Sequence, residues 1–286
     1  MIWYKKANDS TEMELCEKDG VAFFQYQTYR KIPWLAHGFS TRIGGVSTGC
    51  YASMNLGFLK SEPYETVAEN YRRLGSAVGF DWTRAVLSWQ THTTNVRKIT
   101  EADAGKGTVR DRDYRDVDGF ITNVPEIPLV TFYADCVPLY FVDPVHRAIG
   151  LSHSGWRGTV SRMGSETLKA MKREYGTDPD DVIAAIGPSI CGNCFEVGPE
   201  VVETFAKAFT KEQMKTICHP GEGDRSFLDL WKTNQIVLTE AGVRPEHILL
   251  TNACTRCNPD LLYSHRIMGT ERGNLAAVLM IRGNQK

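Results

Sequence analysis

Two histidines and one cysteine stand where apolar runs of this sequence end, and together they could bind one metal ion. His92 lies near the end of an expected strand, Cys136 interrupts an apolar run, and His153 ends another one. Two imidazoles and one thiolate suit zinc, and three protein ligands leave the fourth coordination position for water or a substrate. Because zinc lowers the pKa of bound water toward neutrality, the pattern predicts a catalytic metal site.

The same side chains also fit a reaction without metal. Cys136 could act as a nucleophile with His153 as its base, as in a cysteine hydrolase; metal binding that depends on Cys136 would separate the two interpretations. Asp135 adjoins the thiolate and is a candidate catalytic residue, although neighbouring strand residues point to opposite faces. An isolated buried cysteine is more often a small hydrophobic residue, so the residues alone leave open whether the three segments meet. A non-enzymatic binding module is the third class.

Glycine-rich segments near these residues are candidate anion sites. The turn 155–158 precedes an expected helix, and N–H groups at a helix N-terminus favour an anion, as does Arg157 within the turn. Arg42 precedes Gly44 and Gly45 and is a second candidate clamp. We therefore predict that Arg42, Gly45 and Arg157 bind phosphate or another anionic group. The alternative for each arginine is a solvated or ion-paired surface position.

Motifs for nucleotide cofactors and for base deaminases are absent. No Gly-x-Gly-x-x-Gly follows an expected strand, and Gly105-Lys106 lacks the upstream glycine of a P-loop. The His-x-Glu and Pro-Cys-x-x-Cys signature of zinc base deaminases is missing as well. Neither a dinucleotide nor a nucleoside triphosphate cofactor is therefore expected.

Two Cys-x-x-Cys pairs, Cys191/Cys194 and Cys254/Cys257, are a further possible metal site. Residues 195–253 lie between them, whereas a zinc ribbon has roughly 15 to 20 residues at that position. Distant pairs can converge in space. The spacing nevertheless favours ordinary buried thiols over a structural zinc or redox role.

Composition narrows the class of protein. Of 286 residues, 42% are hydrophobic, which suffices for a large core, and the net charge of -1 offers no broad basic field for nucleic acid or anionic lipid. The first residues lack the apolar core of a signal peptide, and no apolar run approaches the roughly 18 residues that span a bilayer. The 8 cysteines suit a reducing compartment. We therefore expect a soluble cytoplasmic monomer that binds neither nucleic acid nor membrane.

Helical and strand patterns mix along the chain and must position these residues. Apolar spacing predicts helices over 65–79, 159–175, 200–214 and 229–241, the last opened by Asp229 as N-cap. Strands are expected over 21–29, 85–96, 181–186 and 275–281 and within the runs 128–142 and 148–152. Stretches 37–49 and 102–118 are typical of loops, the second of them exposed. Without a regular β-α-β alternation, this order predicts an α+β fold with mixed sheets, in a single domain of residues 1–286.

Short motifs follow one another in a fixed order from about residue 30 onward. They are His37-Gly-Phe-Ser-Thr-Arg42 with Gly44-Gly45-Val-Ser, Gln90-x-His92, Asp118-Gly119, Ala134-Asp-Cys136-x-Pro138, His153-x-Gly-Trp-Arg-Gly158, Ile186-Gly-Pro188, Phe195-Glu-Val-Gly198 and Ser264-x-Arg266. This series resembles the bacterial YlmD/YfiH family, formerly described as laccase-like polyphenol oxidases and related to the human protein FAMIN. Thr93, Ser154 and His265 depart from the Gly, Ala and Arg that are usual there. The first two departures concern pocket lining rather than ligands, and the third leaves the role of that position open.

The resemblance implies more than the residues do. It implies a four-layer α/β/β/α architecture and a zinc ion bound by His92, Cys136 and His153. It also implies phosphorolysis of adenosine, inosine and methylthioadenosine, with adenosine deaminase activity at the same site, so purine nucleosides and phosphate are the expected partners. Editing of peptidoglycan precursors by a hydrolase is an alternative that the family also suggests.

The older oxidase interpretation can be tested by counting histidines. The chain has 7, none of them in a His-x-His pair, which is too few for a multicopper cluster. A full multicopper site is therefore excluded. The single His2Cys site could still accept Cu²⁺, because copper outcompetes zinc for nitrogen and sulfur ligands. Copper-dependent polyphenol oxidase activity would then be adventitious.

Overall fold

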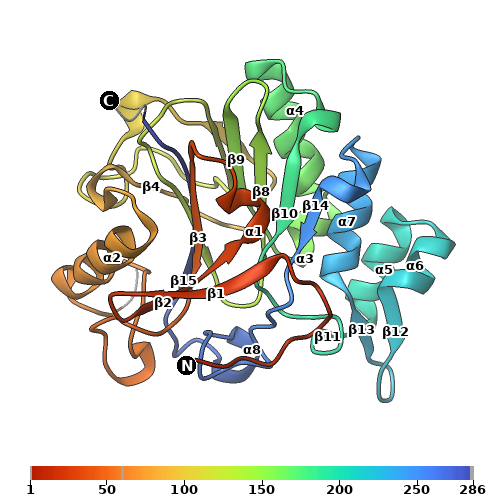
Figure 1. Ribbon diagram of the computed structural model, residues 1–286. Helices are drawn as coiled ribbons and strands as arrows, with labels where there is room; N and C mark the ends of the chain where they lie inside the picture. Colours follow the sequence, from red (N-terminus) through yellow and green to blue (C-terminus); the bar gives the residue numbers. More distant parts are fainter. Residues whose placement is uncertain (1, 59–60, 284–286) are drawn as a thin grey trace.

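Two mixed β-sheets form the centre of the computed structural model, which describes residues 2–58 and 61–283 (Figure 1). The first sheet has the strand order β1 (Met13–Lys18), β2 (Val21–Tyr26), β3 (Leu35–Ser40), β15 (Leu275–Ile281), β7 (Leu129–Tyr133) and β4 (Val86–Leu87). The second has the order β14 (Ile248–Leu250), β10 (Ile183–Ile186), β8 (Val137–Asp143), β9 (Ala148–Ser154), β6 (Gly119–Thr122) and β5 (Val96–Lys98). The pairs β4–β7, β5–β6 and β10–β14 are parallel. Both sheets are therefore mixed.

The inner faces of the two sheets meet in one buried apolar cluster. Phe39 and Leu279 of the first sheet share this cluster with Tyr140 and Ile149 of the second, and each of these side chains is at most 1% exposed. Alternate residues of a strand point to the same face, so a strand between two layers is buried on both sides, as β8 and β15 are. β15 is apolar throughout, and β8 ends in the buried carboxylate of Asp143.

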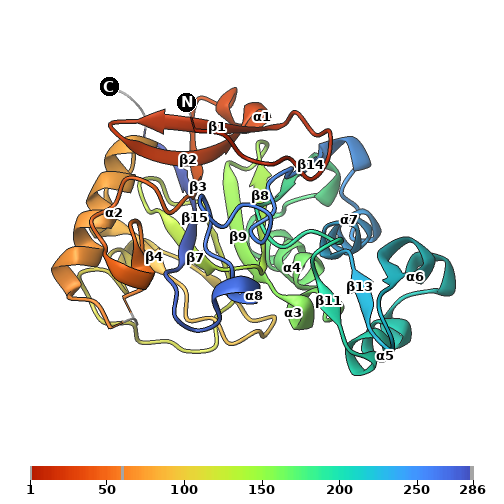
Figure 2. The ribbon, with the colours of Figure 1, turned by 90° about the horizontal axis from the view of Figure 1, so that it is seen from below.

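Helices cover the outer face of each sheet. α2 (Tyr64–Val78) buries Tyr71 and Leu74 against the first sheet. α4 (Met163–Tyr175) and α7 (Leu230–Glu240) pack on the second sheet, at the opposite side of the molecule (Figure 2). The order of layers is therefore α/β/β/α, which confirms the predicted fold class.

The remaining α-helices and strands are short. They are α1 (Gln27–Arg30), α3 (Trp156–Val160), α5 (Pro199–Ala208), α6 (Lys211–Ile217), α8 (His265–Met268) and a small sheet of β11 (Glu196–Val197), β13 (Ser226–Leu228) and β12 (Cys218–Pro220). None of the helices within 2–58 and 61–283 combines the length and the apolar character that a membrane crossing requires.

Several predicted elements are confirmed together with their boundaries. α2 ends at Gly79, whose φ of 91° places it in the left-handed region that favours glycine. Asp229 caps α7 by accepting a hydrogen bond from the backbone N–H of Lys232 at 3.0 Å. The predicted strand 275–281 is β15.

Other predictions were wrong in part. The predicted helix 200–214 is divided into α5 and α6, because Thr210 begins a new helix through a capping box with Gln213. The stretch 37–49 is not loop throughout, since β3 extends to Ser40. The segment 102–118 is not simply exposed, because the buried side chains of Asp103 and Lys106 form an ion pair at 2.8 Å.

Candidate metal centre and active site

His92, Cys136 and His153 lie together, although His153 follows His92 by 61 positions in the sequence. Their ligand atoms are all within 4.8 Å of one another, and the Sγ of Cys136 lies 3.9 Å from the Nε2 of His92. His92 comes from the irregular segment between β4 and β5, Cys136 directly precedes β8, and His153 belongs to β9. Because β8 and β9 pair, Pro138 lies opposite His153. Two nitrogen donors and one sulfur donor in this arrangement fit zinc or copper.

Asp118 holds the two histidines in place from behind. Its buried carboxylate accepts hydrogen bonds from the Nδ1 of His153 at 2.8 Å and from the backbone N–H of His92 at 3.0 Å through one oxygen. The other oxygen accepts from the N–H groups of Thr91 and Thr93 and from the hydroxyl of Thr93, each at 3.0 Å. With Nδ1 engaged, the Nε2 of His153 is the nitrogen left for a metal.

Charge coupling within this group alters its protonation. Burial raises the pKa of the Cys136 thiol, but the nearby imidazoles of His153 and His92 outweigh it and lower this pKa to about 6. Burial lowers the pKa of His153, but Cys136 and Asp118 outweigh it and raise this pKa to about 9. For Asp118, burial raises the pKa, and the hydrogen bonds from His153 and the backbone bring it below the usual value. Without metal, these opposite shifts favour a thiolate at Cys136 beside an imidazolium at His153.

A cavity of about 250 Å³ opens directly onto the three ligands. Its wall carries aromatic, cationic and amide side chains. They are Phe58, Trp89, Phe132, Tyr133, Arg112, Arg272, Gln90 and Asn274. Flat apolar walls with a few polar groups are typical of a small-molecule site.

The two arginines of this cavity are held at fixed positions. The guanidinium of Arg112 lies 4.5 Å from the ring centroid of Trp89 and donates to the carbonyl of Ser88 at 2.6 Å. Arg272 donates from Nη1 to the side chain of Asn274 at 2.7 Å, while its buried Nε has no hydrogen-bond partner among the described residues. Neither arginine is evident as a site residue from the sequence, because Arg112 lies in the segment expected to be exposed and Arg272 lies in a turn before β15.

The predicted phosphate-binding residues lie elsewhere. Arg42 donates to the carbonyls of Ala52 and Pro259 at 2.8 and 2.9 Å. Gly45 packs so tightly that an added Cβ would lie 2.0 Å from the carbonyl oxygen of Ser53. The guanidinium of Arg157 lies 4.2 Å from the centroid of the Trp156 ring. None of the three is among the described residues that line the cavity, so their role in phosphate binding remains a prediction.

Asp135 is engaged in the turn that presents Cys136. Its φ of 92° lies in the region that favours glycine. One carboxylate oxygen accepts from the hydroxyl of Thr255 at 2.6 Å and the other from the backbone N–H of Arg266 at 2.7 Å. The carboxylate is thus occupied by the protein itself, an arrangement suited to holding the turn. Its catalytic role stays a prediction.

Gly155 leaves room for the ligands. A Cβ at this position would lie 2.9 Å from the Cδ2 of His92 and 3.0 Å from the Sγ of Cys136. Both distances are below ordinary contact, so any larger residue at this position would press on two of the three ligands.

Comparison with known proteins identifies the family. The sequence profile of the family described as "Multi-copper polyphenol oxidoreductase laccase" matches residues 36–282. The chain belongs to this family. It is 34% identical over 233 residues to purine nucleoside phosphorylase YlmD of Bacillus subtilis, covering 80% of this chain and 82% of that protein. It is also 34% identical over 241 residues to adenosine deaminase RL5 from an unknown prokaryotic organism, covering 82% and 90% of the two chains.

A solved structure has the same fold. The crystal structure of the hypothetical protein YfiH from Bacillus licheniformis superposes with a TM-score of 0.86 at 27% identity, over 92% of this chain and 98% of that one. The predicted membership of the YlmD/YfiH family is thereby confirmed. The family description names a multicopper oxidase, but the 7 histidines of this chain are too few for a multicopper cluster.

Proposed function

We propose that this chain is a zinc-dependent purine nucleoside enzyme, with His92, Cys136 and His153 as the metal ligands. Its reactions are phosphorolysis of adenosine, inosine and methylthioadenosine, and deamination of adenosine at the same site. The observation that carries this proposal is the cavity, which joins aromatic walls and two arginines to the three candidate ligands. The purine nucleoside phosphorylase and adenosine deaminase names of relatives support the same substrate class.

The cavity wall suits the parts of a nucleoside. A purine is flat and aromatic, and Phe58, Trp89 and Phe132 offer ring surfaces on which it can stack. Phosphate carries negative charge, and Arg112 and Arg272 are the cationic groups of the same wall. The unpartnered Nε of Arg272 is a donor that a bound oxyanion would satisfy, because a buried N–H without an acceptor is costly.

Phosphorolysis requires these groups to hold phosphate beside the anomeric carbon. An oxygen of hydrogen phosphate forms a bond to that carbon while the bond to the purine nitrogen breaks, and the leaving purine takes up the proton that the phosphate loses. Positive charge develops on the ribose during this exchange. A phosphate fixed by Arg112 and Arg272 stabilises that charge and is already positioned for attack.

Deamination requires a water molecule to attack the purine carbon that carries the amino group, with ammonia leaving. Zinc, when bound, acts as a Lewis acid and lowers the pKa of water at its open position. The chain's own contribution is orientation: Asp118 fixes the tautomer of His153 and the backbone of His92. Gln90, which lines the cavity, is held by the backbone of Phe132, accepting from its N–H at 2.6 Å and donating to its carbonyl at 2.9 Å.

Product analysis tests the proposal. Zinc-loaded, copper-free protein is incubated with adenosine and phosphate, and separately with adenosine alone, and the products are resolved by chromatography. Adenine with ribose 1-phosphate is expected in the first reaction, and inosine in the second. The absence of product in both, with zinc bound, would contradict the proposed substrates and leave the metal site standing.

A metal-independent cysteine hydrolase, for example one acting on peptidoglycan precursors, is a second candidate. It is favoured by the thiolate–imidazolium pair of Cys136 and His153, which is the reactive form of such enzymes. Chelation separates the candidates, since a hydrolase keeps its activity after zinc is removed and the proposed purine enzyme loses it. Copper bound at the same three residues would support polyphenol oxidation only in copper-loaded protein.

A further inference from the structure

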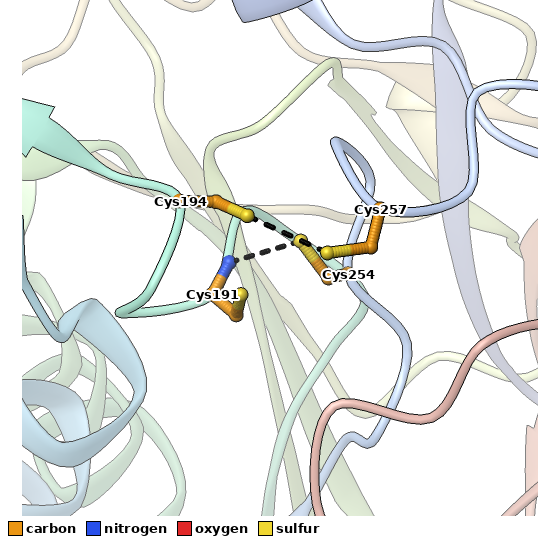
Figure 3. Close-up of side chains that lie close together, drawn as sticks. All are labelled: Cys191, Cys194, Cys254 and Cys257. Carbon is orange, nitrogen blue, oxygen red and sulfur yellow. Dashed lines mark hydrogen bonds between the residues drawn. The ribbon is translucent and has the colours of Figure 1, made fainter.

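Four cysteines that are far apart in the sequence lie together at one end of the second sheet. Cys191 and Cys194 follow β10, and Cys254 and Cys257 follow β14. Because β10 and β14 are parallel neighbours, the loops that leave their carboxyl ends start side by side. The helices α5, α6 and α7 occupy the intervening sequence, so the long separation does not keep the two pairs apart. Figure 3 shows the four side chains converging from the two loops.

The sulfur positions match a mononuclear tetrahedral site. All four sulfur atoms lie within 4.8 Å of one another, and those of Cys194 and Cys257 are 3.4 Å apart. Zinc–sulfur bonds of about 2.3 Å in tetrahedral geometry place the sulfurs about 3.8 Å apart. In a four-iron cluster each thiolate binds a different iron, which requires a wider spacing. The observed cluster is therefore sized for one ion.

The surroundings of the cluster would stabilise thiolates that bind a metal ion. Cys191, Cys194 and Cys254 are buried, each at most 6% exposed. The backbone N–H of Cys191 donates to the sulfur of Cys254 at 3.3 Å, and the guanidinium of Arg256 donates to the sulfur of Cys194 at 3.4 Å. Four thiolates around a divalent ion leave a net negative charge, which N–H donors and an arginine stabilise.

We propose that Cys191, Cys194, Cys254 and Cys257 bind one structural zinc ion, separate from the centre at His92, Cys136 and His153. The sequence spacing does not fit a zinc ribbon, in which both pairs belong to one short segment. Here the sheet provides the proximity that a short segment provides in a ribbon. This site does not depend on the function proposed above.

The zinc site fastens the two loops that hold the turn before Cys136. The backbone N–H of Ile190 donates to the carbonyl of Asp135 at 3.0 Å, and Ile190 directly precedes Cys191. Thr255, which follows Cys254, donates to the carboxylate of the same Asp135 at 2.6 Å. Both loops thus form hydrogen bonds to Asp135, whose positive φ shapes the turn that presents Cys136 to the cavity. The cysteines act as positioning residues for that turn.

Metal analysis of a variant lacking the other centre tests the proposal. Full-length protein with Cys136→Ala is reconstituted with Zn²⁺ under reducing conditions, separated from loosely bound metal by gel filtration and analysed for zinc per chain. One zinc per chain is expected to remain, and reconstitution with Co²⁺ should give thiolate-to-cobalt charge-transfer absorption. Absence of zinc overturns the proposal, as does retained iron in its place or a pair of disulfides found by mass spectrometry.

Further variants locate that zinc. Adding Cys254→Ser to the Cys136→Ala chain should reduce the content from one zinc to none, whereas adding Cys50→Ser, an exposed cysteine elsewhere, should leave it at one. If Cys254→Ser does not fold, titration of the Cys136→Ala protein with a mercurial reagent answers the same question. Zinc should be released as the four cluster thiols react; release on modification of the remaining cysteines alone contradicts the assignment.

Hydrogen exchange tests whether the proposed zinc ion stabilises the turn before Cys136. The N–H of Ile190 reports on the stability of this turn because it donates a hydrogen bond to the carbonyl of Asp135. Removal of the cluster zinc from the Cys136→Ala protein should accelerate exchange of this amide at least tenfold. The N–H of Leu279, in the centre of the first sheet, should keep its rate. Unchanged exchange at Ile190 would show that the ion does not hold the turn.

Discussion

Replacing Asp118 by Asn should uncouple the two histidines from their support while changing the size of the side chain very little. The carboxylate accepts five hydrogen bonds, two on one oxygen and three on the other. An amide can accept on one side only. If its nitrogen faces Thr91 and Thr93, two backbone N–H groups lose their acceptor. If it faces His153, the N–H of His92 loses its acceptor, and the imidazole must place its proton on Nε2, where it cannot bind metal.

The size of the effect follows from these contacts. A hydrogen bond to a charged group contributes about 1.5–3 kcal/mol, so losing two lowers the free energy of unfolding by about 3 kcal/mol or more. Supporting partners of metal ligands typically contribute a factor of about 10–100 in metal affinity. We expect Asp118→Asn to bind zinc about 10- to 100-fold more weakly than the wild type. One orientation of the amide removes the acceptor of both histidines, and the other removes the acceptor of the N–H groups of Thr91 and Thr93 on either side of His92.

Competition with a chromophoric chelator measures that affinity, and thermal unfolding of the metal-free protein measures the stability. Asp116→Asn is the matched control. Asp116 lies on the same loop at the exposed surface, and its carboxylate accepts from the hydroxyl of Thr91 at 3.0 Å. It contacts neither histidine. Wild-type zinc affinity in Asp118→Asn, or an equal loss in Asp116→Asn, would refute the role assigned to Asp118.

Three further perturbations address the ligands themselves. Cys136→Ala should abolish phosphorolysis and metal binding at the His92 centre while the fold persists by circular dichroism; retained turnover would exclude the proposed site. Gly155→Ala should weaken zinc binding by about tenfold or more, because the added Cβ presses on His92 and Cys136. Gly158→Ala, where the nearest atom is 3.5 Å away, should bind zinc normally in the same chelator competition. In metal-free protein, the ultraviolet absorbance of the Cys136 thiolate should be present above pH 6 and lost as the pH falls through about 6. Zinc affinity should fall over the same range because protons compete for the ligand. A titration midpoint near that of a free thiol would contradict the coupling to His153.

The three candidate ligands could be named from the sequence because each is a strong donor near the end of an apolar run, whereas only the family resemblance implied that they meet. The carboxylate that supports the two histidines, that of Asp118, could not be predicted. Asp118 stands at the end of a charged segment that is typical of an exposed loop, yet it is fully buried at the start of β6. The Asp118-Gly119 pair before an apolar run was the available signal, since a carboxylate entering a buried strand needs partners.

The helices and strands could be predicted from the sequence pattern better than their arrangement, and only the family resemblance implied the four layers. Apolar periodicity identified α2, α7 and β15, whose burial patterns are regular. The division of the helix at Thr210 was visible as a capping box, Thr followed three residues later by Gln. The neighbours of each strand were not visible, because pairing joins residues far apart in the sequence. For the same reason, the proximity of the two Cys-x-x-Cys pairs could not be predicted, because it depends on the pairing of β10 with β14.

The position of β15 has a consequence for biosynthesis. This strand lies between β3 and β7 in the first sheet. β3 and β7 are therefore synthesised well before the strand with which both of them pair. At about 5–20 residues per second, the ribosome needs roughly 7–30 s to proceed from β7 to β15. During that interval β3 and β7 lack their common partner, so each exposes an unpaired strand edge of the kind that favours aggregation. Arg272 and Asn274, which line the cavity, directly precede β15, so the sheet and the cavity are completed in the same late step of synthesis.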